Sequence, residues 1–560
     1  MKSTPLFPRN PTQHLQRLIR LESQDLYAVL AFALASGVMA LATPMAVQAL
    51  VNTVAFGVLL QPLVILMLTL FGCLALNGVL NGLQIFVVEM IQRRLFVRLV
   101  SQISVTLMEG RLDHPLFKRG SDLANYYFEV MTVQKTWSNL LLDGLSYGLQ
   151  TLIGLVLLAF YHPALLGFDA LILAALYVIF RILGRKGVET AVAESEAKHA
   201  VASWLQELPR HPLATRYGPG KIWGFERSNH LTEIYLQRSQ DHFKVLMRQQ
   251  VAILGLYAVA NSVLLGLGGW MVIERQLTLG QLVAAELIVS AMLSGVTRLG
   301  KTITSYYDLM AGMDKLSYLL DLPEQPHSPA GPEEAGLIER IGFDGFRISI
   351  GEHEPGRTFA IPDLELSTGD KLLLLTPDSE SAQQLLESLS GFRKPIEGAT
   401  RINGMDTRIL GMDAFRDQSR LVLKPEWFQV SILENIRLGN HSIGAQRIQE
   451  ILRLVGLDES IKKLPEGAHT RLSATGSPLD PQQLSLLTLA RAIAAQPRLL
   501  MLGSLMESLP EPCLALVLDT LLDPQAPWSL IWVTAHAGAA QGIRARARII
   551  RLEPELSRGK

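Results

Sequence analysis

One short stretch decides how the second half of the chain folds: Lys371-Leu-Leu-Leu-Leu-Thr-Pro-Asp378, followed by the segment from Ser379 to Ser390. Its four consecutive leucines predict a buried strand. The turn residues after them end the strand, and the Leu- and Gln-containing segment beyond predicts a helix. A buried strand that runs directly into a helix is typical of an α/β domain.

The sequence before this stretch extends the same domain. Glu339–Ile350 and Arg357–Leu366 predict two short strands. A proline-rich segment, Leu322–Pro332, precedes them and predicts a linker. We therefore expect three parts, which are a membrane domain over residues 1–320, a linker over 321–335 and an α/β domain over 336–560.

The first 300 residues hold most of the apolar character of the chain. Of the 560 residues, 49% are hydrophobic and 18% are charged, which is a high apolar fraction for a soluble protein. A helix needs about 20 mostly apolar residues to cross a bilayer. The segments that meet this need lie at about residues 27–53, 62–90, 137–161, 163–184, 250–273 and 278–299.

Charge is sorted along the chain although it sums to zero. Lys and Arg number 51, as do Asp and Glu, which excludes a strongly basic nucleic-acid binder and an acidic disordered protein. Basic residues gather near the N-terminus and in the two long stretches after spans 2 and 4, whereas the short links hold only Arg275. The positive-inside rule therefore predicts an integral membrane protein with both termini in the cytoplasm. Residues 190–208 are rich in helix formers, so we expect the spans to continue into the cytoplasm as helices.

A few ionisable residues lie within the predicted spans, and the clearest are Asp143, Asp169, Arg181 and Glu286. A charge in the hydrocarbon is costly and usually faces the protein interior or a water-filled cavity. Glu286, near the middle of the sixth span, is the best candidate for lining a substrate path. The alternative is a hydrogen bond between helices or subunits, or pairing with a basic group. Pro44 predicts a kink in the first span.

The cysteines and histidines predict neither a disulfide framework nor a metal site. Cys73 and Cys513 fall in different halves of the chain, and the 12 histidines show no metal-ligand spacing. The first 25 residues lack the short apolar core of a secretory signal peptide. The chemistry of the chain must therefore be sought in its other motifs.

The second half carries motifs in the order found in ABC transporters. They are Gly369-Asp-Lys371, Gly391, Pro395–Gly398, Ile402–Asp406, Ser431–Ile436, and Leu489–Ala492 with Pro497–Leu502. With six spans and two long cytoplasmic loops before them, the chain resembles an ABC exporter half-transporter over nearly its whole length. Its membrane half looks closest to the permease-ATPases of type I secretion systems. The resemblance implies an α-helical six-span type I ABC exporter membrane domain followed by an α/β P-loop-like nucleotide-binding domain.

The phosphate-binding loop of that family is degenerate in this chain. A working loop needs glycines whose N–H groups cradle the phosphates, a Lys, and a Ser or Thr on Mg²⁺. The aligned stretch has no glycine, and it has Ala at the Lys position and Gln at the Ser/Thr position. It consists of Thr376, Pro377, Asp378, Ser379, Glu380, Ser381, Ala382 and Gln383. Its two carboxylates add negative charge beside any polyphosphate, which argues against tight nucleotide binding.

The other motifs of the nucleotide site are also altered. Gly503-Ser504 stands where the family has the Asp-Glu pair that serves Mg²⁺ and the attacking water, and Leu423 replaces the Gln-loop glutamine. The aromatic residue that usually stacks on adenine aligns with Ile348. The switch histidine is retained as His536. Since general acid–base catalysis needs partners within reach, we do not expect His536 to act alone.

The signature loop, which closes over the partner subunit's ATP in this family, is lost as well. The Leu-Ser-Gly-Gly-Gln consensus aligns with Leu479, Asp480, Pro481, Gln482 and Gln483. Asp480 places a carboxylate where a hydroxyl would face a phosphate, and Pro481 removes a backbone N–H. Repulsion in such a partly dry site is on the order of a few kcal/mol. Since each ABC site pairs one chain's phosphate loop with the other chain's signature, this chain is expected to have lost both contributions.

Three functions remain open on this evidence. The first is a catalytically impaired half-transporter subunit that forms half of an export pathway together with an ATP-competent ABC partner. The second is a membrane scaffold or regulatory pseudo-transporter without transport activity. The third is an active ATP-binding exporter whose motifs diverge. We expect little or no ATP hydrolysis by the chain itself, no tightly bound cofactor, and ATP and Mg²⁺ supplied through a partner if at all.

The resemblance also implies partners and a location. We expect a heterodimer with an ATP-competent half-transporter, contact with the lipid bilayer and, as in type I secretion relatives, a periplasmic adaptor. We expect no nucleic acid and no metal site. The implied location is a bacterial inner membrane. The sequence carries no substrate-specific motif.

Overall fold

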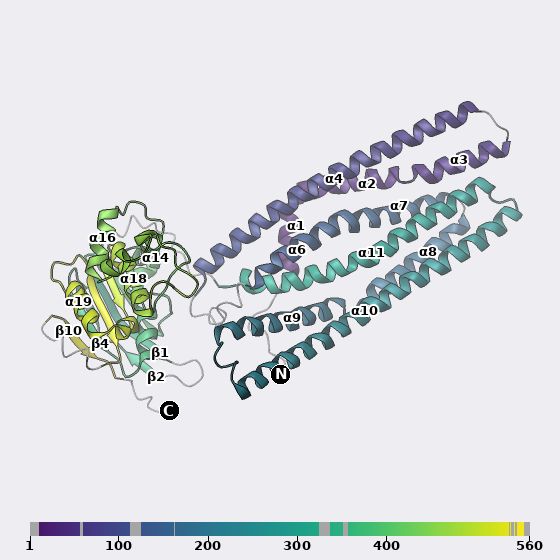
Figure 1. The fold of residues 1–560 in the computed structure, drawn as a ribbon. Helices are drawn as coiled ribbons and strands as arrows, with labels where there is room; N and C mark the ends of the chain where they lie inside the picture. Colours follow the sequence, from purple (N-terminus) through teal and green to yellow (C-terminus); the bar gives the residue numbers. More distant parts are fainter. Residues whose placement is uncertain are drawn as a thin grey trace. The chain divides into compact units, whose positions relative to one another are not determined.

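The chain divides into two compact units in the computed structural model, one of long helices and one of α/β type (Figure 1). The described residues are 11–56, 60–111, 125–161, 163–323, 336–350, 357–536, 538, 543 and 546–553. Residues 324–335, which make up most of the predicted linker, lie outside this set, as do residues 1–10.

Within the described residues, six helices of the first unit are long and apolar enough to cross a membrane, as the sequence predicts. They are Ser23–Asn52, Leu63–Glu109, Phe128–Phe160, Leu165–Arg210, Gly218–Ile273 and Leu279–Leu320. All but the first extend well beyond the predicted apolar segment at one end. The extensions fall in the polar, basic stretches of the sequence, so the expectation that the spans run on as helices is confirmed.

The helices of this unit have interruptions at defined places. In chain order they are α1 (Pro11–Leu21), α2 (Ser23–Met39), α3 (Ala42–Phe56), α4 (Leu60–Glu109), α6 (Phe128–Asn139), α7 (Leu145–Tyr161), α8 (Pro163–Tyr177), α9 (Gly187–Arg210), α10 (Gly218–Ile273) and α11 (Leu279–Leu320). Two π-helical segments, η2 (Leu140–Gly144) and η3 (Val178–Leu183), follow α6 and α8. Such segments are frequent at functional sites. They contain Asp143 and Arg181, two of the four ionisable residues noted in the spans.

The first span is broken near the proline that predicts a kink. α2 ends at Met39 and α3 begins at Ala42. Pro44 lies in the first turn of α3, where it has no N–H to bond the carbonyl oxygen one turn earlier and where its ring disfavours a continuous helix. The predicted kink is therefore confirmed, and it falls just before the proline.

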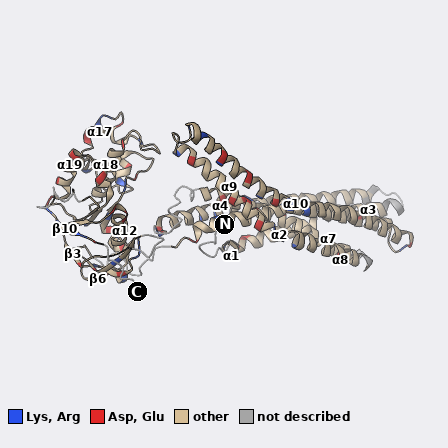
Figure 2. Ribbon diagram, turned by 90° about the horizontal axis from the view of Figure 1, so that it is seen from below, with Lys and Arg blue, Asp and Glu red and all other residues tan. Residues whose placement is uncertain are grey.

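Apolar side chains cover much of the outside of the helical unit. In the most apolar part of α4, none of the residues is buried. Exposed apolar surface on this scale is typical of a face that meets lipid or another subunit. Figure 2 shows charged residues along the parts of α9 and α10 near their connecting loop and few of them toward the other end of the bundle. The high apolar fraction of the chain is thus located on these helices.

The second unit contains two sheets within its described residues. One is antiparallel, with strand order β2-β1-β5-β6 and with β3 paired to β1, and the other is parallel, with order β10-β4-β9-β8-β7. The strands are β1 (Arg340–Ile350), β2 (Arg357–Ala360), β3 (Leu364–Ser367), β4 (Lys371–Leu375), β5 (Glu397–Ile402), β6 (Met405–Asp406), β7 (Ser419–Val422), β8 (Leu499–Leu502), β9 (Ser529–Thr534) and β10 (Arg548–Arg551). The helices are α12 (Ser379–Leu389), α13 (Thr407–Leu410), α14 (Met412–Gln418), α15 (Ile432–Arg437), α16 (Ala445–Leu454), α17 (Asp458–Lys462), α18 (Pro481–Ala494) and α19 (Glu511–Leu521), with short 3₁₀ segments η5 (Gly467–His469) and η6 (Ser504–Ser508).

One strand prediction is wrong in detail. The single strand expected over Arg357–Leu366 is two strands, β2 and β3, which pair with different parts of β1. Pro362 lies between them and has no N–H to donate to a ladder, so the strand cannot continue through it. The next residue, Asp363, accepts the backbone N–H of Gly345 through Oδ1 at 2.7 Å, at an irregularity of β1.

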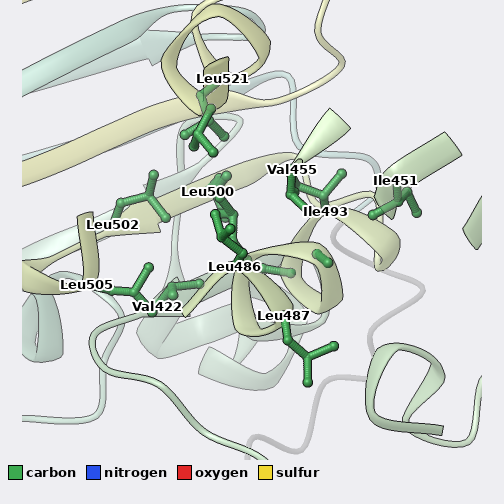
Figure 3. Packing of buried hydrophobic residues seen from close by; sticks show 14 of the residues in the cluster. Val422, Ile451, Val455, Leu486, Leu487, Ile493, Leu500, Leu502, Leu505 and Leu521 are labelled. Atoms are coloured by element: carbon green, nitrogen blue, oxygen red, sulfur yellow. The ribbon is translucent and has the colours of Figure 1, made fainter. Parts of the chain in front are cut away.

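The parallel sheet is buried on both faces, as the leucines of β4 predict. Leu373 and Leu375 face one core, which lies around α18, while Leu372 and Leu374 face a second core that includes α12. Figure 3 shows the first core, in which side chains of α18 such as Leu486 pack with Leu500 and Leu502 of β8 and with Val455 beyond α16. This packing fixes the strand ends from which the candidate site is built.

A buried lysine begins β4. Lys371 donates a hydrogen bond from Nζ to the carbonyl oxygen of Trp528 at 2.7 Å, and the ammonium lies 5.8 Å from the centroid of the Trp528 ring. Burial disfavours the charged form and lowers the pKa of Lys371 to about 8, although Asp523 and Asp370 act in the opposite direction.

Candidate nucleotide site

The predicted site residues gather at one edge of the parallel sheet. β4 pairs with β9, and β9 pairs with β8, all in parallel, so their carboxyl ends lie at the same edge. Thr376 follows β4, Gly503 follows β8, and His536 lies two residues beyond β9. Ligands of open α/β sheets bind outside this edge. The structure therefore brings together the residues that the sequence aligns with the phosphate loop, with the end of the Mg²⁺-binding strand and with the switch histidine.

At the start of α12, the backbone N–H groups of Ser381 and Ala382 are bonded to Asp378. β4 ends at Leu375 and α12 begins at Ser379, so only residues 376–378 connect them. Asp378 caps the helix, because its Oδ1 accepts the Ser381 N–H at 2.7 Å and its carbonyl oxygen accepts the Ala382 N–H at 3.2 Å. A phosphate at a helix start would need such N–H groups. Here the Asp378 carboxylate holds one of them.

The side chains at the former Lys and Ser/Thr positions do not face a phosphate. Ala382 is 2% exposed and belongs to the core that also contains Leu385 and Leu386. Gln383 is exposed and donates its amide to Glu387 Oε1 at 2.7 Å. Neither position supplies a cation or a Mg²⁺-binding hydroxyl.

Leucines fill the place of the Mg²⁺-binding carboxylate. A β-carbon added to Gly503 would lie 3.0 Å from Leu386 Cδ1 and 3.0 Å from Leu423 Cδ2. An aspartate there would crowd both side chains and place its charge among apolar groups, which is unfavourable. The Ser504 hydroxyl, at the position of the family's catalytic carboxylate, donates to the carbonyl oxygen of Leu423 at 3.2 Å. The residues present at this edge therefore do not fit ATP with Mg²⁺.

Ile348 and Leu423, which the sequence aligns with the adenine-stacking residue and the Gln-loop glutamine, do not fit ATP with Mg²⁺ either. Ile348 lies in β1 opposite Phe359 and is buried in the core, so it offers no surface for a base to stack on. Leu423 is partly buried and packs against the same core. Among the described residues of both units, no group of three or more His, Cys, Asp or Glu side chains could hold a metal ion.

A carboxylate that the sequence analysis missed lies beside the retained histidine. Glu507 Oε1 accepts the Thr534 hydroxyl at 2.5 Å, and Glu507 Oε2 lies 3.5 Å from His536 Nε2. Thr534 Oγ1 in turn accepts the backbone N–H of His536 at 3.1 Å. His536 itself is 71% exposed. The signal that could have found Glu507 is its place in the segment just after β8, at the same edge of the sheet as His536.

The start of α18, where the signature aligns, is capped in the same way as α12. Asp480 Oδ1 accepts the Gln483 N–H at 2.8 Å, and Gln483 Oε1 accepts the Asp480 N–H at 3.0 Å, which forms a capping box. Pro481 is the first helical residue and has no N–H to offer. Leu479 is buried and Gln482 is exposed. This helix start also carries its own carboxylate.

In the membrane unit, two of the ionisable residues have buried oxygens without a hydrogen-bond partner among the described residues. Glu286 lies on α11, seven residues after the helix begins, and its Oε2 is buried with no hydrogen-bond partner among the described residues. Asp169 on α8 is 5% exposed, and in the same described set neither of its carboxylate oxygens has a partner. Asp143 and Arg181 are exposed.

A comparison with solved structures identifies the architecture. A bacterial Atm1-family ABC exporter with ATP bound matches 95% of this chain and 94% of its own, with a TM-score of 0.78 and 15% sequence identity. The chain has the fold of an ABC exporter. The expected fold class, six apolar helices followed by an α/β nucleotide-binding-type domain, is therefore confirmed. At this identity the likeness shows the fold alone.

Curated relatives are similar over shorter stretches, and no protein-family model matches the chain. The mycobactin import ATP-binding/permease protein IrtB of Mycolicibacterium smegmatis is 23% identical over 283 residues, 49% of this chain and 48% of that protein. The fatty acid ABC transporter ATP-binding/permease protein of Mycobacterium bovis is 28% identical over 44% of this chain and 38% of its own length. The leukotoxin export ATP-binding protein LtxB of Aggregatibacter actinomycetemcomitans is 25% identical over 46% and 37%. The chain thus spans about half or less of the length of these relatives.

Proposed function

We propose that the chain is a catalytically impaired ABC half-transporter subunit that forms half of an export pathway with an ATP-competent ABC partner. The observation that carries the proposal is the capping of both helix starts that would meet phosphate, by Asp378 at α12 and by Asp480 at α18. A phosphate that bonds the N–H of Ser381 or Gln483 would have to displace the capping carboxylate, and it would approach a like charge. The chain would therefore contribute poorly to both composite sites of a dimer.

The packing at the strand end supports the same proposal. Leu386 and Leu423 fill the space beside Gly503, where a Mg²⁺ ligand would stand. His536 then faces Glu507 rather than a phosphate. General acid–base catalysis by a histidine requires a reacting group within reach, and a neighbouring carboxylate adds negative charge where the γ-phosphate would lie.

The membrane unit favours a transport subunit over a passive one. It has six candidate spans, and among the described residues both carboxylate oxygens of Asp169 and the Oε2 of Glu286 are buried without a hydrogen-bond partner. Ionisable residues at such depth often mark substrate or ion pathways. The relatives are named for import of mycobactin, transport of fatty acid and export of leukotoxin, so they support transport and leave the substrate of this chain open.

A second candidate function is a membrane scaffold or regulatory pseudo-transporter. Asp480 and Pro481 favour it, because an ABC partner would rely on this chain's signature for one of its own sites. In that case the α/β unit would serve as a docking module. The first proposal also includes an ATP-competent partner, a periplasmic adaptor and a location in a bacterial inner membrane, which the resemblance to ABC exporters supports. It places both termini in the cytoplasm, which the positive-inside pattern supports.

The test uses the full chain purified in detergent and returned to lipid nanodiscs. We expect no Mg²⁺-dependent ATP hydrolysis above empty nanodiscs and no specific labelling by a photoreactive ATP analogue. Affinity purification from its own cells should recover an intact ABC half-transporter at one-to-one stoichiometry. Turnover that disappears in His536→Ala would instead support the active exporter, and absence of any ABC partner would support the scaffold.

A further inference from the structure

A cavity of about 1010 Å³ lies between α9 and α10. Its lining is mostly apolar and includes Leu183, Val245, Val251 and Ala252. Basic residues Lys186, Arg238, Lys244 and Arg248 also line it, together with the carboxylates Glu189 and Asp241. The cavity therefore combines an apolar wall with an excess of positive charge.

The cavity lies at the boundary between apolar and polar helix. Span 4 is predicted to end near residue 184 and span 5 to begin near residue 250, so Lys186 and Arg248 each lie two residues outside the apolar segments. Leu183 and Val251 lie on the apolar side of the same boundary. This is the depth at which the headgroups of a bilayer leaflet meet a membrane protein.

Most of the cations at this cavity are not neutralised by the protein. Lys244 pairs with Asp241 at 3.0 Å, one turn away on α10. Within the described part of the chain, Lys186, Arg238 and Arg248 form no ion pair with a carboxylate. Four cations against two carboxylates leave an excess of two positive charges, and this charge faces a space lined by apolar side chains.

We propose that this cavity binds an anionic phospholipid, with its phosphate against Lys186 and Arg248 and its glycerol and first acyl carbons along Leu183, Val251 and Ala252. Basic pockets between membrane helices attract anionic headgroups. A soluble anion would gain nothing from the apolar wall, and a neutral lipid would leave the cations unpaired. Exposed apolar residues of α10 beyond the cavity, such as Leu254, extend a path for the acyl chains.

The site adjoins a π-helical segment. η3 ends at Leu183, which lines the cavity, and α9 begins four residues later at Gly187. Thr190, which also lines the cavity, joins α9 to α10, because its Oγ1 lies 2.9 Å from Nδ1 of His242. A bound phospholipid would therefore contact both helices at the place where span 4 changes its helical geometry. Lipid binding in this cavity does not require ATP. The leaflet that supplies the lipid depends on the orientation given under the proposed function.

The test measures lipid adducts by native mass spectrometry on the full chain, with its partner if one copurifies. The probes are phosphatidylglycerol and phosphatidylcholine with identical acyl chains. We expect phosphatidylglycerol to bind about tenfold more tightly than phosphatidylcholine. The double variant Lys186→Gln/Arg248→Gln should lose this preference. The control Lys221→Gln/Arg227→Gln removes the same charge from exposed positions on α10 outside the cavity and should keep it.

A second variant tests the apolar wall without a change in charge. Ala252→Trp would fill the groove and should weaken the binding of both lipids, while thermal unfolding of the variant shows whether it is folded. Equal binding of the two lipids to the unaltered chain, or an equal loss in both double variants, would overturn the proposal. So would displacement of phosphatidylglycerol by millimolar inorganic phosphate, or burial of the cavity by a second copy of the chain. None of these outcomes depends on whether the chain hydrolyses ATP.

Discussion

The carboxylates of the two units of this chain have different surroundings. At the edge of the parallel sheet and at the start of α18, Asp378, Asp480 and Glu507 each accept hydrogen bonds from the chain itself. In the membrane helices, Asp169 and the buried oxygen of Glu286 have no such partner among the described residues. These three carboxylates of the α/β unit are hydrogen-bonded within the chain, whereas the two of the membrane unit have buried oxygens without a partner among the described residues.

The unpartnered carboxylate oxygens of the membrane unit are places where a further group could bind. A buried polar group without a hydrogen bond costs about 1–3 kcal/mol, and more if it is charged. Such a cost is offset when a substrate, a proton or a partner subunit completes the site. A carboxylate that already caps a helix needs nothing further. The comparison therefore directs the search for a binding group to Asp169 and Glu286 in the membrane helices.

The largest effect is expected from restoring an aspartate to the strand end of the soluble unit. Gly503→Asp should lower the free energy of unfolding by about 3–5 kcal/mol, because it leaves an unpaired charge between Leu386 and Leu423. Thermal unfolding of the full chain in detergent measures this, with Gly503→Ala as the size control. If the variant is as stable as the unaltered chain and gains Mg²⁺-dependent ATP binding, the prediction is wrong, because the space beside residue 503 would then accept a Mg²⁺ ligand.

The next effect tests the membrane side directly. Asp169→Leu removes a buried carboxylate that has no partner, so it should raise the free energy of unfolding by about 1–3 kcal/mol while lowering transport by the assembled complex. Unfolding in detergent and transport in proteoliposomes give the two readouts, and Asp169→Asn separates charge from size. If stability falls instead, Asp169 has a partner in the assembly and the contrast between the units is weaker than described.

The caps of the soluble unit should each contribute about 1 kcal/mol. Asp378→Ala and Asp480→Ala are expected to speed amide hydrogen exchange at Ser381 and Gln483, whose N–H groups they now bond. Asp480→Ser retains a capping oxygen and serves as the matched control. Unchanged exchange in both alanine variants would mean that these carboxylates do not hold the helix starts and that the N–H groups remain available to a ligand.

The smallest effect concerns a buried cation of the soluble unit. Lys371 has a pKa lowered to about 8, whereas the unfolded chain keeps the ordinary value of 10.5. Between these values the unfolded state binds more protons, so this group makes the fold more stable as pH rises above 8. The gain between pH 8 and pH 9 should be about 1 kcal/mol or less, since one pKa unit corresponds to about 1.4 kcal/mol. Lys371→Met should remove this slope in pH-dependent unfolding; an unaltered slope would show that other groups produce it.

The sequence predicts the elements well because their signals are local. Four leucines in β4, Pro44 in the first span and the six apolar segments each act through neighbouring residues. Pro362 is also a local signal, and it predicts a break in the strand. The apolar residues on both sides of it nevertheless favoured one strand, where the structure has two. The residues at the phosphate-loop and signature positions were assigned from the order of motifs along the chain, and their loss of function stays a prediction.

The contacts between residues that are distant in the sequence could not be predicted from local signals. Leu386 and Leu423 meet beside Gly503 only after the sheet has formed, since they lie far apart in the sequence. Glu507 reaches Thr534 and His536 because β8 and β9 are neighbours. The cavity between α9 and α10 likewise depends on how two long helices pack, and the sequence shows only the basic residues that line it.

One long helix gives the membrane unit a mechanical property. α11 runs from Leu279 to Leu320 without interruption and begins with a capping box at Thr278, whereas the first span is broken at residues 40–41. At 1.5 Å per residue it is about 63 Å long. A rigid rod of that length acts as a lever, so a tilt of about 5° at one end displaces the other by about 5 Å. Glu286 lies near the Leu279 end of α11. A small tilt of the helix there would thus become a movement of several ångströms at the Leu320 end.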